Sequence, residues 1–279
     1  IGDSGWANFA TDTDANRIAT SNEDGSDDYI YSTQGQDILI GSIGNDTLTS
    51  GTDNQRDIII GDQATITFST SSNGRFDTDT LITAVSDISD INDHGNDTIT
   101  TGAGNDVILG GAARDNITAG EGNNIILGDN GDIAINTAGH LTSANSTDAN
   151  DRTTDNDTIT TGTGDDTILG GNATDTITAN AGDDIILGDN GQAIFNEAGI
   201  LTAVTTTDET IGAQDIITTG QGNDIAFGGV GTDYINVDSS DTTIKFADDG
   251  NDILIGDSGW ANFATDTDAN RIATSNEDG

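Results

Sequence analysis

Aspartate recurs at every ninth position along much of this chain, and this spacing constrains the fold more than any other feature of the sequence. Asp157, Asp166, Asp175 and Asp184 keep the spacing without interruption. An isoleucine or leucine stands within two residues after almost every acid of the series, as Ile38 follows Asp37. Each nine-residue row therefore predicts a turn followed by a short strand whose aliphatic side chain points inward. Two rows would form one turn of a parallel coil.

The rows are grouped into longer repeats. Residues 1–25 recur without change as residues 255–279, an offset of 254 positions. Four related blocks of rows lie at 26–62, 95–131, 155–191 and 213–257. Insertions occupy 63–94, 132–154 and 192–212, and the repeated segments 1–25 and 258–279 take the corresponding place at the two ends. The arrangement predicts one unit of a tandem array followed by the start of the next unit.

The charge of the chain calls for bound cations if the rows pack into a compact fold. The formal net charge is -42, and only five of the 49 acids are glutamate. Aspartate suits turns, because its short carboxylate reaches nearby backbone and metal. The chain has no cysteine, so metal ions rather than disulfides would stabilise it. High charge with few aromatic residues also fits disorder, but the regular isoleucine and leucine spacing argues against it.

The rows resemble the nonapeptide Gly-Gly-x-Gly-x-Asp-x-U-x of the repeats-in-toxin (RTX) family, where U is a large aliphatic residue. Residues 41–48 and 228–235 are close matches, whereas residues 110–115 and 179–184 lose glycines. The resemblance covers the four blocks, roughly half of the chain. It implies an all-β fold, a parallel β-roll or β-solenoid with calcium in its turns. It also implies a giant tandem-repeat bacterial protein that leaves the cell by type I secretion.

The turns offer oxygen ligands to a cation. Backbone carbonyls and one carboxylate would line each turn, about 4.8 Å from the turn of the next coil. Hard oxygens at this spacing suit Ca²⁺, which takes about six to eight of them. The resemblance implies that each ion is shared by rows n and n+2. The pairs would be Asp28–Asp46, Asp37–Asp57, Asp97–Asp115, Asp157–Asp175, Asp166–Asp184, Asp215–Asp233 and Asp106–Asn124.

Two row positions depart from this scheme. Asn124 is a neutral ligand, which predicts a weaker site, and Asp224 has no clear partner because residues 238–250 interrupt the register. The aspartates of the Gly-Asp pairs that close the blocks complete the set of candidate ligands. The candidate metal ligands are Asp28, Asp37, Asp46, Asp57, Asp97, Asp106, Asp115, Asn124, Asp157, Asp166, Asp175, Asp184, Asp215, Asp224, Asp233, Asp252, Asp62, Asp129, Asp189 and Asp257.

The insertions should all leave the roll from one edge, because four rows make two full coils. Residues 135–141 and 195–201 place a glycine-containing polar turn between apolar residues, which predicts β-hairpins. We therefore expect a flat roll with β-hairpin insertions along one edge. The hairpins either pack on one another and cover the roll or bind a ligand, and packing is the favoured hypothesis.

The sequence favours a structural function over catalysis. His94 and His140 lie in separate insertions, and the seven basic residues do not cluster as a polysaccharide lyase would require. We expect a calcium-stabilised repeat of a secreted or cell-surface bacterial protein, acting as a rigid extender, surface layer or filament. Its expected partners are further copies of the repeat and cell-surface or matrix components. A chain this acidic repels nucleic acid, and no apolar run predicts membrane insertion.

Two alternatives remain open. The repeat could be a calcium-dependent ligand-binding module, either adhesive or ice-binding. It could also be the accessory repeat region of a secreted polysaccharide-acting enzyme.

Overall fold

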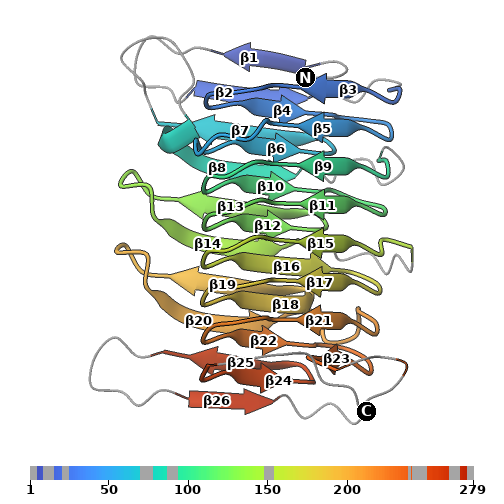
Figure 1. Cartoon of the computed structure of the whole chain (residues 1–279), viewed down its shortest axis with the longest axis vertical. Helices are drawn as coiled ribbons and strands as arrows, with labels where there is room; N and C mark the ends of the chain where they lie inside the picture. The colour runs from blue at the N-terminus through green and yellow to red at the C-terminus, as the bar shows by residue number, and fades with distance from the viewer. Residues whose placement is uncertain are drawn as a thin grey trace.

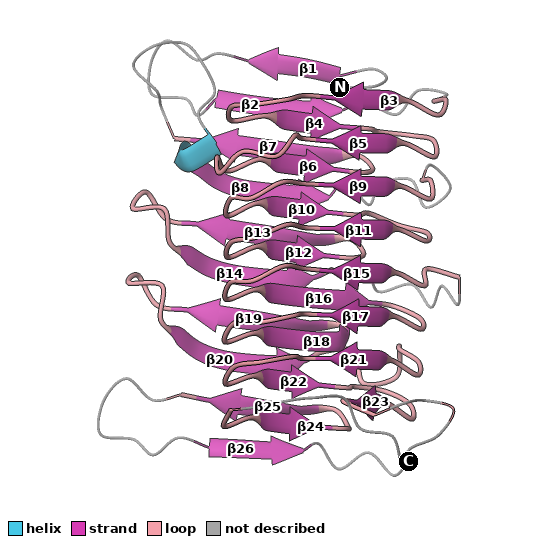
Figure 2. Ribbon diagram, in the orientation of Figure 1, coloured by secondary structure: helices cyan, strands magenta, loops and turns pink. Residues whose placement is uncertain are grey.

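The chain winds into a roll whose coils stack along one axis (Figure 1). The computed structural model describes residues 5–8, 16–20, 25–69, 78–86, 94–147, 154–237, 240, 250–263 and 271–274. Apart from one 3₁₀ turn, η1 (Thr78–Thr80), the regular elements of these residues are strands (Figure 2). They form three sheets, two of them parallel, so the prediction of an all-β roll is confirmed. No helix in the described ranges has the length and apolar character that crossing a membrane requires.

One parallel sheet, the outer sheet, has one exposed face. Most of its strands place a buried aliphatic residue between two more exposed ones, as in Thr98-Ile99-Thr100. Alternate side chains of a strand point to opposite faces, and threonine suits the exposed face of a pleated sheet. The outer sheet consists of β3 (Tyr29–Tyr31), β5 (Thr47–Thr49), β9 (Thr98–Thr100), β11 (Asn116–Thr118), β15 (Thr158–Thr160), β17 (Thr176–Thr178), β21 (Ile216–Thr218) and β23 (Tyr234–Ile235).

The second parallel sheet, the central sheet, is buried on both faces along most of its length. Most of its strands are apolar at all three leading positions, as in Ile58-Ile59-Ile60, which is typical of strands covered on both sides. The central sheet consists of β4 (Ile38–Ile40), β6 (Ile58–Ile60), β10 (Val107–Leu109), β12 (Ile125–Leu127), β16 (Thr167–Gly171), β18 (Ile185–Asp189), β22 (Ile225–Phe227) and β24 (Ile253–Ile255).

The insertions build a third, antiparallel sheet, the hairpin sheet. Each insertion forms one hairpin, and successive hairpins pair with each other, as β8 does with β13 and β14 with β19. The insertion residues 9–15, 70–77, 87–93, 148–153, 241–249 and 264–270 lie outside the described ranges. The hairpin sheet consists of β1 (Gly5–Asn8), β2 (Asn16–Thr20), β7 (Ala64–Phe68), β8 (Leu81–Ser86), β13 (Gly131–Ile135), β14 (Leu141–Ser146), β19 (Gly191–Phe195), β20 (Leu201–Thr206), β25 (Gly259–Asn262) and β26 (Arg271–Thr274).

Two apolar layers hold the three sheets together. The middle residue of each central strand from β4 to β22 packs toward the outer sheet, and most flanking residues pack toward the hairpin sheet. The prediction that Ile38 faces the roll interior is therefore wrong. Leu39, two residues after Asp37, occupies that place, whereas Ile38 packs in the layer beneath the hairpin sheet. The strand begins directly after the acid, so the second position is the one that points into the roll.

The two edges of the roll differ in what they connect. At the exit edge, on the right in Figure 1, the chain leaves a central strand and reaches an outer strand through a short turn or an insertion. At the return edge, it passes from an outer strand back to a central strand through a turn, except between β23 and β24, where the connection is longer. Short exit turns alternate with insertions, so the prediction that all hairpins leave from one edge is confirmed. The hairpins pack on one another and over the central sheet.

We expect the substitution Ile126→Ala to lower the free energy of unfolding by about 2–5 kcal/mol, because it leaves a cavity between the outer and central sheets. Ile126 is fully buried in that layer. Thr118→Ala, on the exposed face of the outer sheet, should change the same quantity by less than about 1 kcal/mol. Urea unfolding in saturating calcium, followed by circular dichroism, measures both. Equal losses would contradict the layering.

Candidate calcium sites

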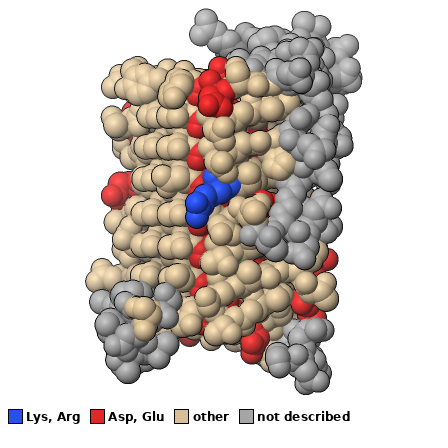
Figure 3. Space-filling view, turned by 90° about the vertical axis from the view of Figure 1, so that its right-hand side faces the viewer, with Lys and Arg blue, Asp and Glu red and all other residues tan. Residues whose placement is uncertain are grey.

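The acid that ends each exit turn or insertion lies directly before an outer strand and belongs to a column along the roll axis. The backbone N–H of each acid donates to Oδ1 of the acid in the next coil, as from Asp97 to Asp115 at 2.7 Å. Figure 3 faces this edge and shows a line of acidic residues running along the axis. The exit column is Asp28, Asp46, Asp97, Asp115, Asp157, Asp175, Asp215 and Asp233.

A second column follows the return edge, where each member lies directly before a central strand. The same bond joins its members, as from Asp166 N to Asp184 Oδ1 at 2.8 Å. The return column is Asp37, Asp57, Asp106, Asn124, Asp166, Asp184, Asp224 and Asp252. All seven pairs expected from the sequence therefore lie in adjacent coils.

The columns are more continuous than the sequence predicted. The prediction that Asp224 has no clear partner is wrong, because its backbone N–H donates to Oδ1 of Asp252 at 3.0 Å. Strand β24 pairs in register with β22, so the excursion between them does not break the column. The columns also cross the insertions, as from Asp46 N to Asp97 Oδ1 at 2.7 Å.

The second carboxylate oxygen of most column members is buried and accepts no hydrogen bond. Burial of a carboxylate oxygen without a donor or a cation costs free energy. The acids in this state include Asp28, Asp37, Asp97, Asp115, Asp157, Asp175, Asp184, Asp215 and Asp233.

The first residue of each exit turn or insertion is a glycine, and oxygens from two coils converge beside it. A Cβ on Gly110 would lie closer than 3.0 Å to Oδ2 of Asp115 and to the carbonyl oxygen of Gly128 in the next coil. Each such glycine thus leaves open a space bordered by one carboxylate and one carbonyl oxygen. The same arrangement occurs at Gly41, Gly61, Gly128, Gly170, Gly188 and Gly228.

Burial raises the pKa of many of the column carboxyls. It raises the pKa of Asp97 to about 8 and, with the neighbouring carboxylate of Asp157, the pKa of Asp115 well above its ordinary value. On the return edge, burial raises the pKa of Asp184 to about 7 and that of Asp166 to about 6. In the absence of a cation these carboxyls keep their protons to a higher pH than an ordinary aspartate, and a bound cation would favour their charged form.

The aspartates that close the blocks lie where the insertions begin, and they bind backbone amides. Asp62 accepts hydrogen bonds from two backbone N–H groups of later turns, at 2.7 and 3.2 Å. Asp129 and Asp189 accept amides in the corresponding places of the next blocks. Asp257 is exposed in the last described coil. In this arrangement the first three anchor the ends of insertions to the following coil.

Asn124 differs from every other row position because it carries no carboxylate. Its Oδ1 accepts the N–H of Asp106 at 3.1 Å, as the acids do. Its Nδ2 donates to the carbonyl oxygens of Gly120 and Gly122, at 3.2 and 2.9 Å. In this orientation an amide N–H donor faces the carbonyls, and the weaker calcium site expected at Asn124 stays a prediction.

The donor set as a whole fits calcium. Within the described ranges, no three or more His, Cys, Asp or Glu side chains form a group that could hold a metal. A cation between two coils would therefore take a few carboxylate oxygens and complete its shell with backbone carbonyls. Such a set contains only hard oxygens, which is what Ca²⁺ prefers. The donor-free carboxylate oxygens and the space beside the exit-edge glycines are consistent with it.

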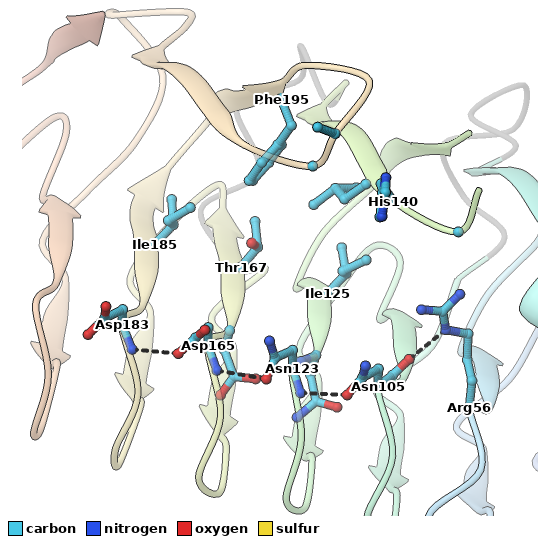
Figure 4. Close-up of a pocket in the computed structure, with 16 residues that line it drawn as sticks. Arg56, Asn105, Asn123, Ile125, His140, Asp165, Thr167, Asp183, Ile185 and Phe195 are labelled. Atoms are coloured by element: carbon cyan, nitrogen blue, oxygen red, sulfur yellow. Dashed lines mark hydrogen bonds between the residues drawn. The ribbon is translucent and has the colours of Figure 1, made fainter. Parts of the chain in front are cut away.

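A further ladder at the return edge was missed by the sequence reasoning. The residue before each column member is often Asn or Asp, and its Oδ1 accepts the N–H of its counterpart in the next coil (Figure 4). Asp165 N donates to Asn123 Oδ1 at 3.0 Å, and Asp183 N donates to Asp165 Oδ1 at 2.9 Å. The signal in the sequence was the pair of Asn or Asp residues that ends most of the return turns. This ladder runs on the exposed side of the return column.

The groove in Figure 4 lies between the return turns and the tips of two hairpins and has a volume of about 300 Å³. His140 lines it, with Nδ1 3.1 Å from the carbonyl oxygen of Glu197. Arg56 also lines it and donates from Nε to the carbonyl oxygen of Asn105 at 2.9 Å. His94 lies just before β9, at the exit edge, so the two histidines are on opposite edges of the roll.

We expect the substitution Gly110→Ala to raise the calcium concentration needed for folding and to destabilise the loaded roll by about 1–3 kcal/mol, because its Cβ would overlap two oxygens. Gly256 holds the same motif position in the last coil and has open space around it. Gly256→Ala is therefore a matched control that should leave both quantities nearly unchanged. Calcium titration followed by circular dichroism measures the midpoints. Equal midpoints for the two variants would contradict the proposed geometry.

We expect opposite pH dependences with and without calcium. Without it, the raised pKa values mean that protonated carboxyls stabilise the roll; this contribution is full below 3.8 and is lost as the pH rises through about 6 for Asp166 and about 8 for Asp97. With calcium, protons compete with the ion, so acid should weaken the roll. Thermal unfolding in chelator and in calcium, at about pH 5 and pH 8, tests this. Greater calcium-free order at the higher pH would refute it.

Comparison with known protein families identifies the family of the nine-residue rows. The model of the RTX calcium-binding nonapeptide repeat matches residues 24–54, 94–116, 152–186, 212–244 and 246–260. Comparisons with curated proteins and with solved structures gave no match. The matched segments contain most of the column members and their turns. The rows of this chain therefore belong to the RTX calcium-binding nonapeptide repeat family, and Ca²⁺ is their cofactor.

Proposed function

We propose that this chain is a calcium-stabilised rigid extender in a secreted or cell-surface protein, built from units that continue one another head to tail. The observation that carries the proposal is the unbroken pairing of all three sheets through the described coils. Calcium binds between successive coils. The array serves as a spacer that holds its two ends at a fixed distance and does not catalyse a reaction. RTX repeats as a family are structural calcium-binding elements.

The pairing of the first and last hairpins supports a continuous array. At the start of the chain, β2 pairs with β7, with Ile18 opposite Ile66. At the end, β25 pairs with β20, with Ala261 opposite Val204. Because 1–25 and 255–279 are identical, one hairpin has both partners in an array. Strand β26 would pair with the β7 of the next unit, as β2 does here.

The carboxylate columns support the same junction. Gly256, whose counterparts earlier in the roll border cation spaces, has no atom near its Cβ position. In the next unit, the position equivalent to Asp28 would follow Asp233 in the exit column, and the position equivalent to Asp37 would follow Asp252 in the return column. Each junction would then complete two steps of the columns. The partners of this unit are accordingly further copies of the repeat.

Calcium would control where the protein folds. Without a cation, ionised carboxylates within each buried column repel one another, so the chain would stay unfolded at low cytosolic calcium and neutral pH. Extracellular calcium would drive folding, since extracellular modules bind the ion with dissociation constants of about 10⁻⁴–10⁻³ M. This supports an extracellular location.

The arrangement of the described side chains supports a structural role rather than an enzymatic one. His94 and His140 lie on opposite edges, and Arg56 and Arg114 each donate to a backbone carbonyl of a neighbouring turn. No base, nucleophile and cation converge among these residues. A catalytic site at these residues would need further catalytic groups from another part of the full protein.

We expect chains of one, two and three 254-residue units to lengthen by about 40 Å per unit, because eight coils advance about 4.8 Å each. Small-angle scattering and electron microscopy in calcium measure this length. Chelation should abolish both the β-sheet circular dichroism and the elongated particles, and added calcium should restore them.

Two outcomes would overturn the proposal. A compact fold that survives chelation would refute calcium stabilisation and reopen the ligand-binding alternatives. Units that behave as separately tumbling beads would refute the continuous extender, even if calcium binding were confirmed.

A further inference from the structure

We propose that the return turn 119–124 takes no calcium ion, because the side-chain amide of Asn124 occupies the place of the cation. The inference rests on the proposed function, in which calcium holds the other coils together. In this row the Asn124 amide holds the turn together without a metal, an arrangement called here the metal-free clamp. The clamp divides the calcium sites of the return column into two segments.

Every polar atom of the Asn124 side chain has a partner inside the roll. Its residue is 1% exposed. Oδ1 accepts the N–H of Asp106 at 3.1 Å, and Nδ2 donates to the carbonyl oxygens of Gly120 and Gly122, at 3.2 and 2.9 Å. The backbone N–H of Asn124 itself donates to Oδ1 of Asp166 at 2.7 Å, so the row keeps its place in the column. Nothing on this side chain remains to bind an ion.

The turn 179–184 shows what the same place looks like with an acid. Both turns begin with alanine and carry glycine at the fourth position, Gly122 in one and Gly182 in the other. Asp184 is 1% exposed and ends the second turn. Its Oδ2, which stands where Nδ2 stands in Asn124, is buried and accepts no hydrogen bond. A carboxylate oxygen beside carbonyl oxygens requires a cation, whereas an amide nitrogen satisfies the carbonyls directly.

The charges along the column agree with this assignment. Asp184 places a buried carboxylate in its turn, and a cation would balance that charge. Asn124 carries no charge, so its row needs no cation to balance it. The calcium steps of the return column would then lie on either side of it, through Asp37 to Asp106 and through Asp166 to Asp252.

Reciprocal substitutions test the proposal in the full 279-residue chain. Asn124→Asp replaces the donor with an acceptor and should add one bound Ca²⁺ per chain. Asp184→Asn should remove one while leaving the calcium-loaded roll folded, because the new amide can donate to Gly182. Metal analysis after equilibrium dialysis, normalised by amino-acid analysis, gives the change relative to the wild type.

A second measurement does not depend on counting ions. In asparagine-selective ¹⁵N spectra of the calcium-loaded protein, Asn124 should give a side-chain amide pair that exchanges slowly with solvent. The pair should vanish in Asn124→Asp, and Asp184→Asn should gain a similar one.

The outcomes separate this inference from the proposed function. Unchanged calcium content in Asn124→Asp, or a rapidly exchanging Asn124 amide in the wild type, would overturn the metal-free clamp while leaving the calcium-stabilised roll intact. A wild-type chain that folds without binding any calcium would instead overturn the proposed function. A gain of one ion in the first variant and a loss of one in the second, with both amide signals as expected, would establish the clamp.

Discussion

Two columns of buried carboxylates, repeated at every coil, are the constraint on which the rest of this structure depends. Each acid positions the next coil by accepting a backbone N–H, as Asp115 does from Asp97, so the carboxylates must be inside for the coils to stack. The same burial raises the pKa of Asp115 and leaves its second carboxylate oxygen without a donor, as it does for several other members. Stacking of the coils therefore buries carboxylates whose charged form is unfavourable inside the roll. Bound calcium balances that negative charge. Asn124 avoids the charge in one row by a different chemistry.

The third sheet changes what the roll can support. A coil of two short strands encloses only one large aliphatic residue from each row, such as Ile99 and Ile108. The hairpin sheet covers the other face of the central sheet and adds a second apolar layer, in which Phe68 and Phe227 are fully buried. This explains why the central strands are apolar throughout, whereas the outer strands alternate with threonine. Calcium thus stabilises a roll that already has two apolar layers, one on each face of the central sheet.

The sequence contains most of the fold because the period is local and repeated. The spacing of the acids predicts the rows, and counting four rows per block predicts the shared edge of the insertions. The merger of the hairpins into one sheet depends on the spacing of coils in three dimensions, which residues 135–141 alone do not encode. The same holds for Asp224 and Asp252, whose separation in sequence hides their adjacency. The donor role of Asn124 could be recognised only once Gly120 and Gly122 were seen to face it.

The alternation of short turns and insertions has a mechanical consequence. In the proposed array, tension on the ends would act first on a terminal coil, because each coil contacts mainly its neighbours. A coil closed by a short turn, such as Asp97 to Asp115, holds 18 residues and would release about 60 Å of chain. A coil closed by an insertion, such as Asp115 to Asp157, holds 42 residues and would release about 140 Å. Under load, such a stalk would yield in alternating short and long steps, each absorbing work before the next coil is exposed to the force.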